Sequence, residues 1–316
     1  MMHWSAFLLS GGPRDHGVGA TLRMPLDDFP VHDSLTAAEA WLEVISEADV
    51  VSNAMPAPMK YVRLLADGDP RIDSPKRADF WIETPEPRSH RGVAGSIADA
   101  IRDIGKDDVG DWVLVLESSA CPAVDIEALF RSIGDEQESS VILGISDLER
   151  ISGCYMVRRD LYDLVPDTGF FDFKEQLLSR AIEANHRIGV VRVAERARRM
   201  HTREGWISCV KAWIERSGNP DHELFDSSGP WKKREGPCVI RPTATVEDST
   251  ILSSIIMDGA VVEPGAVVAR SIVGPGVRVP ADTVLVDAVL ATGMDRAMLK
   301  GRNRRRGGSP ASGGKA

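Results

Sequence analysis

Over the first 225 residues, short apolar runs alternate with amphipathic stretches in which apolar residues recur at helical spacing. The apolar runs predict buried strands at residues 5–9, 79–83 and 112–116. The amphipathic stretches predict helices at residues 35–45, 94–104 and 124–133. Strands that alternate with helices are typical of a mixed, mostly parallel sheet covered on both faces. The pattern therefore predicts an α/β domain over residues 1–225.

A different pattern follows residues 226–238, a turn-rich stretch that is predicted to be a linker. Aliphatic residues then recur at intervals of five or six, at Ile240, Val246, Ile251, Ile256, Val262, Val268, Val273, Val279, Leu285 and Leu290. One aliphatic residue per repeat, with glycine, proline or aspartate between, is typical of a β-helix, here over residues 239–292. Because this length makes fewer than three coils, the unit should dock on the α/β domain or on another subunit.

The charge is unevenly distributed along the chain. The formal net charge is −9, yet the residues from Arg296 onward include seven basic and no acidic side chains. The first 295 residues carry 31 basic and 47 acidic side chains. This excess of acidic side chains would repel the phosphates of a nucleic acid, which argues against nucleic acid as a partner. Residues 293–316 are rich in Gly, Arg and Ser and are predicted to form a disordered basic tail.

The cysteines and the apolar runs bear on the compartment. Cys121, Cys154, Cys209 and Cys238 lie 33, 55 and 29 residues apart, which fits neither a metal site nor a disulfide framework. No run approaches the roughly 20 apolar residues of a membrane span. The N-terminus also lacks the basic flank and long apolar run of a signal peptide. These observations predict a cytoplasmic protein with no membrane partner.

Several segments of the α/β region carry motif-like sequences. They are Phe-Leu-Leu-Ser-Gly-Gly at 7–12, a Gly-x-Ala-Gly-Ser stretch within 87–98, the strand and loop at 113–126, Ser-Gly-Cys-Tyr-Met-Val at 152–157, and Asp-Phe-Lys-Glu within 171–178. In this order, and followed by a β-helix, they resemble the sugar-1-phosphate nucleotidyltransferases, such as the mannose-1-phosphate guanylyltransferases and glucose-1-phosphate adenylyltransferases. The resemblance implies a Rossmann-like nucleotidyltransferase domain followed by a short left-handed β-helix.

The resemblance also implies which residues meet the nucleotide. Gly11, Gly12 and Arg14 stand in the first glycine-rich loop, and Gly92 and Gly95 stand in the second. Backbone amides of such loops hold phosphate groups, and an arginine neutralises them. The first loop departs from the family pattern, because Pro13 lacks an amide donor and no lysine precedes Lys60. Arg14 is therefore the candidate phosphate-binding and catalytic side chain in this loop.

The metal motifs depart further from the family pattern. Ser119 stands where the family has the aspartate of Asn-Gly-Asp, and Arg199 stands where it has the second metal aspartate. A serine hydroxyl does not supply the carboxylate charge that holds Mg²⁺ beside a triphosphate. Glu117, two residues earlier on the same strand face, is the candidate substitute metal ligand and catalytic residue. The family's lysine-bearing sugar-phosphate segment has no counterpart between Ile133 and Gly153.

Two functions therefore follow from the resemblance. The first is a divergent transferase that joins a nucleoside triphosphate to a sugar 1-phosphate, using Mg²⁺, and releases pyrophosphate. The alternative is a non-catalytic relative, with no cofactor, that binds a nucleotide or nucleotide sugar or regulates an active paralogue. Either form is expected to be a homo-oligomer or to pair with a paralogue. A hexapeptide acyltransferase is disfavoured because no histidine follows His222, and the β-helix argues against a glycosyltransferase.

Overall fold

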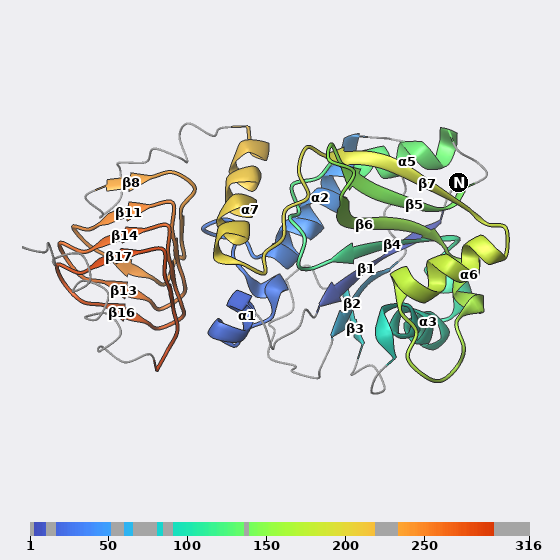
Figure 1. Cartoon of the computed structure of the whole chain (residues 1–316), viewed down its shortest axis with the longest axis horizontal. Coiled ribbons are helices and arrows are strands. Elements are labelled where there is room, and N and C mark those ends of the chain that lie inside the picture. The colour runs from blue at the N-terminus through green and yellow to red at the C-terminus, as the bar shows by residue number, and fades with distance from the viewer. Residues whose placement is uncertain are drawn as a thin grey trace, which may run out of the picture.

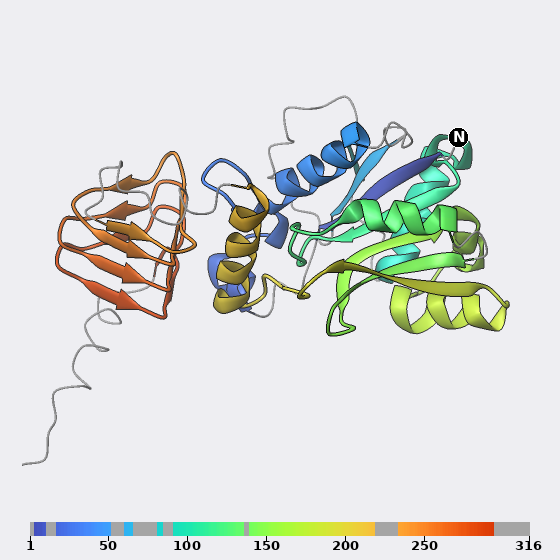
Figure 2. The same ribbon diagram turned by 90° about the horizontal axis from the view of Figure 1, so that it is seen from above.

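The computed structural model describes residues 3–10, 17–51, 60–65, 81–84, 91–135, 139–218 and 233–293. Two parts are visible, an α/β part and a stack of short strands, and α1 and α7 lie between them in both views (Figures 1 and 2). Gly11, Gly12 and Arg14 lie outside the described residues, as does nearly all of the predicted basic tail.

The α/β part is built on a seven-stranded sheet in the order β3-β2-β1-β4-β6-β5-β7. Its strands are β1 (Trp4–Ser10), β2 (Tyr61–Leu65), β3 (Trp81–Thr84), β4 (Trp112–Glu117), β5 (Ser139–Ser146), β6 (Ile151–Arg158) and β7 (Arg187–Ala194). All neighbouring pairs are parallel except those of β6 with β4 and with β5. The predicted α/β class with a mixed, mostly parallel sheet is confirmed.

The helices of this part cover the two faces of the sheet or, for the first and the last of them, lie between the sheet and the stack of short strands. They are α1 (Gly17–Leu22), α2 (Ala37–Val51), α3 (Gly92–Ile104), α4 (Lys106–Val109), α5 (Ile126–Asp135), α6 (Leu178–Glu183) and α7 (Arg203–Arg216), with 3₁₀ turns η1 (Leu26–Asp28) and η3 (Arg159–Leu164) and a π turn η4 (Phe173–Leu177). The helices predicted at 35–45, 94–104 and 124–133 correspond to α2, α3 and α5. The start of α2 is set by a capping box, because Thr36 and Glu39 each accept the other's backbone N–H.

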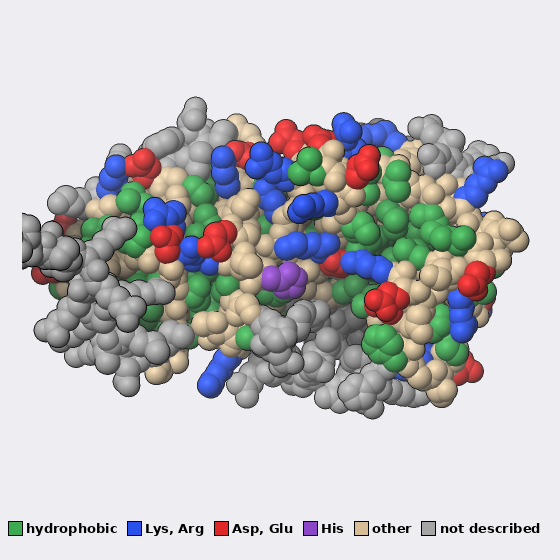
Figure 3. Space-filling view, viewed as in Figure 1, with side chains coloured by type: hydrophobic (Ala, Val, Ile, Leu, Met, Phe, Trp, Pro, Cys, Tyr) green, Lys and Arg blue, Asp and Glu red, His purple; other side chains and the backbone are tan. Residues whose placement is uncertain are grey.

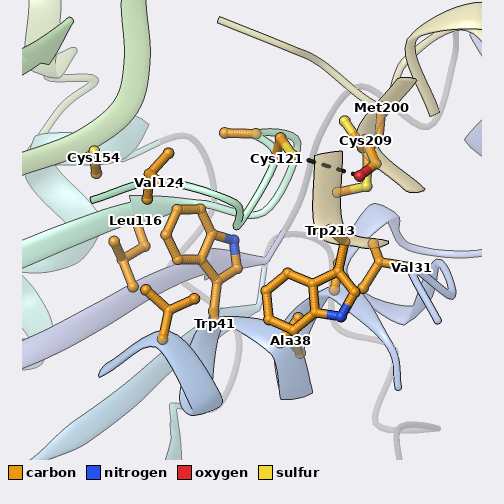
Figure 4. Packing of buried hydrophobic residues seen from close by; sticks show 14 of the residues in the cluster. Val31, Ala38, Trp41, Leu116, Cys121, Val124, Cys154, Met200, Cys209 and Trp213 are labelled. Atoms are coloured by element: carbon orange, nitrogen blue, oxygen red, sulfur yellow. Dashed lines mark hydrogen bonds between the residues drawn. The ribbon is translucent and has the colours of Figure 1, made fainter. Parts of the chain in front are cut away.

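Alternation along the central strands divides the core into two layers. On β4, Leu114 and Leu116 pack on one face with α2, α5 and α7, while Val113 and Val115 pack on the other with α3 and α6. Figure 4 shows the first layer, in which Trp41 of α2 lies between Leu116 and Trp213 of α7. This packing brings α7, late in the sequence, into the same apolar layer as α2.

Residues 233–293 form a three-faced stack of parallel strands, which we call the solenoid. Its strands are β8 (Lys233–Glu235), β9 (Val239–Ile240), β10 (Thr245–Val246), β11 (Thr250–Leu252), β12 (Ile255–Ile256), β13 (Val261–Val262), β14 (Val267–Ala269), β15 (Ile272–Val273), β16 (Arg278–Val279), β17 (Val284–Val286) and β18 (Val289–Leu290). They make three sheets, in the orders β10-β13-β16, β17-β14-β11-β8 and β18-β15-β12-β9. The first strand, β8, lies within the segment expected to be a linker.

The predicted aliphatic ladder lines the interior of the solenoid. All ten of its residues, from Ile240 to Leu290, are buried in one apolar cluster. Residues one coil apart are in register, as in Ile251 with Val268 and Val268 with Leu285. The inward assignment of this ladder is confirmed.

The solenoid docks on the α/β part through a second set of aliphatic residues. Val239, Ile255 and Ile272 occupy successive strands of the β18-β15-β12-β9 sheet and are buried in the same cluster as Trp206 of α7. Asp33 adds a polar contact. Its carboxylate accepts hydrogen bonds from Nη1 and Nη2 of Arg234 at 3.0 and 3.1 Å and from the backbone N–H of Ile240 at 2.8 Å. The solenoid was expected to dock on the α/β domain or on another subunit, and the structure shows contact with the α/β domain.

Asp33→Ala is expected to lower the free energy of unfolding by about 2 kcal/mol, because it removes a bidentate charged contact from Arg234, which is only 8% exposed. Urea unfolding followed by circular dichroism measures the change. Lys106→Ala is the control, since it breaks an ion pair with Asp163 whose partners are 51% and 55% exposed and should cost less than about 1 kcal/mol. Equal losses in the two variants would contradict a docking role for Asp33.

Candidate functional site

The sheet order reverses between β1 and β4. From β1 the chain proceeds to β2 and β3 on one side, and then returns through α3 to β4 on the other side of β1. In open α/β sheets, ligands bind at the carboxyl ends of the strands where the order reverses in this way. Here Leu9 of β1 is in register with Glu117 of β4, and the Ser118 N–H donates to the Leu9 carbonyl at 3.2 Å. Glu117 therefore lies at the switch point.

Four side chains meet at this point, and we call them the Glu117 cluster. The carboxylate of Glu117 accepts hydrogen bonds from the Tyr155 hydroxyl and from Arg199 Nη1, and Lys174 Nζ lies 3.0 Å from Oε1. The side chain of Glu117 is only 18% exposed. Burial opposes its ionisation, but Arg199, Tyr155 and Lys174 outweigh burial and lower the pKa of Glu117 below its ordinary value. Glu117 is therefore an ionised carboxylate held by two cations.

Arg199 is brought here by a short antiparallel contact. Ala120 and Arg199 form an isolated bridge, and the Met200 N–H donates to the Ser119 carbonyl at 2.8 Å. The guanidinium also donates to the Ser119 hydroxyl at 3.3 Å and to the Ile151 carbonyl at 3.2 Å. The structure thus brings together the three residues that the metal motifs singled out, Glu117, Ser119 and Arg199.

The close approach of Arg199 explains a glycine in β6. Gly153 has a φ of 86°, and a Cβ built on it would lie 2.5 Å from the Ala120 Cβ and 2.9 Å from Arg199 Nη1. Any larger residue would therefore push the guanidinium away from Glu117. The Ser-Gly-Cys-Tyr segment supplies both this gap and Tyr155, the hydroxyl donor.

Lys174 reaches the cluster from the segment between β6 and α6. Asp172 caps this turn by accepting the backbone N–H groups of Lys174 at 2.7 Å and Glu175 at 2.9 Å. The Phe173 ring packs on Tyr155 with centroids 5.1 Å apart. In the sequence, Lys174 and Tyr155 belong to segments that carry the resemblance, but nothing else in the sequence marks either one as a site residue. The signal for both was their place inside two motif-like segments.

Described residues on either side of the first glycine-rich segment have backbone partners near the Glu117 cluster. Leu9, just before it, lies beside Glu117, and the Val18 N–H, just after it, donates to the His201 carbonyl at 3.0 Å. His201 is two residues from Arg199, and burial together with the Arg199 guanidinium lowers its pKa. Gly11, Gly12 and Arg14 fall between Leu9 and Val18 in the sequence and lie outside the described residues.

The second predicted loop lies against the segment that carries Lys174. Gly92 opens α3, and a Cβ built there would lie 2.7 Å from the Phe171 carbonyl oxygen. The Gly95 N–H donates to that same oxygen at 3.2 Å. The structure thus assigns Gly92 and Gly95 a packing role beside Phe171, and the Gly95 amide is already paired.

The residues at the switch point do not fit a magnesium ion. Mg²⁺ prefers oxygen ligands, usually one or two carboxylates, beside substrate phosphates. Here both oxygens of Glu117 are engaged by cationic or hydroxyl donors, Ser119 is neutral, and Arg199 places a positive charge beside them. Within the described residues, no group of three or more His, Cys, Asp and Glu side chains could hold a metal ion.

The sequence matches no protein-family model and no curated protein. Among solved structures, the chain is similar to Rv0371c from Mycobacterium tuberculosis H37Rv, with 14% identity and a TM-score of 0.46, over 66% of this chain and 97% of that one. No helix in the described part of the chain combines the length and apolar character needed to cross a membrane.

Proposed function

We propose that this chain is a nucleotidyltransferase-like protein that binds a nucleotide or nucleotide sugar at the switch point without metal-dependent transfer. The observation that carries the proposal is the position of Arg199. Its guanidinium is bound to Glu117 and Ser119, where the resemblance requires carboxylates around Mg²⁺. Between the two functions expected from the sequence, this geometry favours the non-catalytic one.

Charge at the reacting phosphate distinguishes the two functions. Nucleotidyl transfer relies on a divalent ion that bridges phosphate oxygens and stabilises the charge developing on them. A guanidinium supplies one positive charge and hydrogen-bond donors, but it lacks the open coordination positions of a metal ion. The site is thus suited to holding an anionic ligand and poorly suited to activating it.

The remaining parts of the proposal concern architecture and partners. We take the α/β part to be a Rossmann-like nucleotidyltransferase domain, and the solenoid to be a left-handed β-helix, because its hexapeptide-like spacing is typical of that fold. Such a protein would act in the cytoplasm as a homo-oligomer or beside an active paralogue. Its ligand-bound form would then act through an interface rather than through product formation.

A panel of nucleoside triphosphates and sugar 1-phosphates, incubated with Mg²⁺ and followed by pyrophosphate release, tests the absence of transfer. We expect release at the background rate from the wild-type protein, while equilibrium dialysis detects binding of one of the nucleotides or nucleotide sugars. Ser119→Asp should not restore turnover, because Arg199 still occupies the site beside the new carboxylate.

Turnover of the wild-type protein that depends on Mg²⁺ would contradict the proposal. It would support the divergent transferase instead, with Glu117 as the substitute ligand and Arg14 at the phosphates. Absence of both turnover and nucleotide binding would also contradict it, and would favour a purely structural role for the α/β part.

A further inference from the structure

The Glu117 cluster carries a net positive charge. Lys174 and Arg199 each bring one positive charge, and Glu117 brings one negative charge, because its pKa is lowered. Lys174 is 47% exposed and Arg199 is 29% exposed, whereas Glu117 is the most buried of the three charged groups at 18%. The cations therefore face the solvent and the carboxylate lies behind them. Figure 3 shows basic side chains and a histidine across the middle of this face, between the solenoid and the sheet.

Both cations keep hydrogen-bond donors that the described part of the chain does not use. The contacts of Arg199 involve its two terminal nitrogens, to Glu117, Ser119 and Ile151, which leaves the Nε–H and one Nη2 hydrogen. Lys174 Nζ makes one ion pair, with Glu117, and carries three hydrogens. Because one carboxylate holds both cations, the guanidinium and the ammonium lie close to each other.

We propose that Arg199 and Lys174 form a metal-free binding site for the diphosphate group of a nucleotide. This inference rests on the proposed function and names the part of the ligand that the switch point recognises. A diphosphate presents several anionic oxygens, so it can accept from a guanidinium and an ammonium at once. In this arrangement Glu117 is a positioning residue, which fixes the two cations without touching the ligand.

The arrangement has a consequence for metal dependence. Where a divalent ion bridges protein carboxylates and phosphate, chelation of the ion removes the binding. Here the positive charges belong to the protein, so removal of divalent ions should leave the binding intact. Mg²⁺ added in excess should weaken it, because Mg²⁺ occupies phosphate oxygens in solution and is repelled by Arg199 and Lys174.

Isothermal titration calorimetry of the full-length protein with inorganic pyrophosphate tests the inference, in EDTA and in excess MgCl₂. We expect binding in EDTA that is equal to or tighter than binding in MgCl₂. Lys174→Gln should weaken it about tenfold, the effect of losing a charge-assisted hydrogen bond. Lys106→Gln is the matched control, because that lysine is similarly exposed and ion-paired but belongs to α4, and it should leave the affinity unchanged.

A second variant and a second ligand sharpen the result. Arg199→Lys keeps the charge beside Glu117 but loses the donor fork, and should also weaken pyrophosphate binding while the circular dichroism spectrum stays unchanged. ADP, GDP and UDP, titrated in turn, separate the sources of the diphosphate: tighter binding of one of them than of pyrophosphate points to a nucleotide ligand.

Three outcomes would overturn the inference. They are pyrophosphate binding that requires Mg²⁺, no pyrophosphate binding by the wild-type protein, and equal affinity in the wild-type protein and Lys174→Gln. If a nucleoside diphosphate still binds while Lys174→Gln has no effect on it, the proposed function stands and only this phosphate site is wrong. If neither pyrophosphate nor any nucleotide binds, both proposals fail.

Discussion

Val268→Asp is expected to lower the free energy of unfolding by about 4 kcal/mol or more. Val268 is fully buried in the solenoid, where it lies in register between Ile251 and Leu285 of the neighbouring coils. An aspartate there would place a charge without a cationic partner in an apolar interior. Urea unfolding followed by circular dichroism at neutral pH measures the loss.

Val284→Asp is the matched control for this substitution. Val284 lies on β17, in the same sheet as Val268, but its side chain points outward and is 53% exposed. The same chemical change there should alter the free energy of unfolding by less than about 0.5 kcal/mol. A Val268→Asp protein that unfolds at the same urea concentration as the control would contradict the inward assignment of the ladder.

The interior of the solenoid could be predicted from the sequence because its rule is local. One inward aliphatic residue per face is enough to establish the period, and each coil repeats it. The face that docks on the α/β part follows a second pattern, in which the residue next to an inward aliphatic residue is apolar as well. Along one sheet, each two-residue strand is apolar at both positions, as in Ile255–Ile256 and Ile272–Val273, and the outward residue packs on the α/β part. That doubling is visible in the sequence and indicates a second apolar face.

Within the α/β part, the helices and strands with strong apolar patterns were predicted, and others were not. The alternation of β7 leaves Val190 58% exposed, as suits an edge strand, so the strand lacks a continuous apolar run. The prediction also missed α7, although Thr202 caps it by accepting the Gly205 N–H. In both cases the signal was present but weaker than that of the central strands.

Some residues of the Glu117 cluster could be predicted from the sequence, and others are identified only by the structure. The motif resemblance predicted that positions 117, 119 and 199 belong together, and the structure places them in contact. Tyr155 and Lys174 join them only because β6 pairs with β4 and because the capped turn before α6 directs the lysine back over the sheet. Such contacts depend on tertiary arrangement, so spacing along the chain does not predict them.

Arg199→Met is expected to destabilise the protein by about 3 kcal/mol at pH 8, because it removes the main counter-charge from a largely buried carboxylate. In the wild-type protein, folding lowers the pKa of Glu117, so the ionised carboxylate stabilises the fold. This stabilisation is complete above the pKa that Glu117 has in the unfolded chain, and it is lost as the pH falls through the pKa that Glu117 has in the folded protein. In the variant, burial should outweigh Lys174 and Tyr155 and raise the pKa of Glu117. The ionised carboxylate then destabilises the fold instead of stabilising it. The stability lost by substitution should therefore be larger at pH 8 than at pH 5, as urea unfolding at the two values will measure.

The double variant Glu117→Gln/Arg199→Met separates this electrostatic effect from lost packing. Glutamine keeps the shape of the side chain and an acceptor for the Tyr155 hydroxyl, and no unpaired carboxylate remains, so most of the loss at pH 8 should be recovered. Glu117→Gln alone should cost less than Arg199→Met, because Arg199 is 29% exposed and water can solvate the freed guanidinium. If the double variant is as unstable as Arg199→Met and its deficit does not change between pH 5 and pH 8, then Arg199 acts through packing, and a charge-balanced cluster at the switch point is the wrong description.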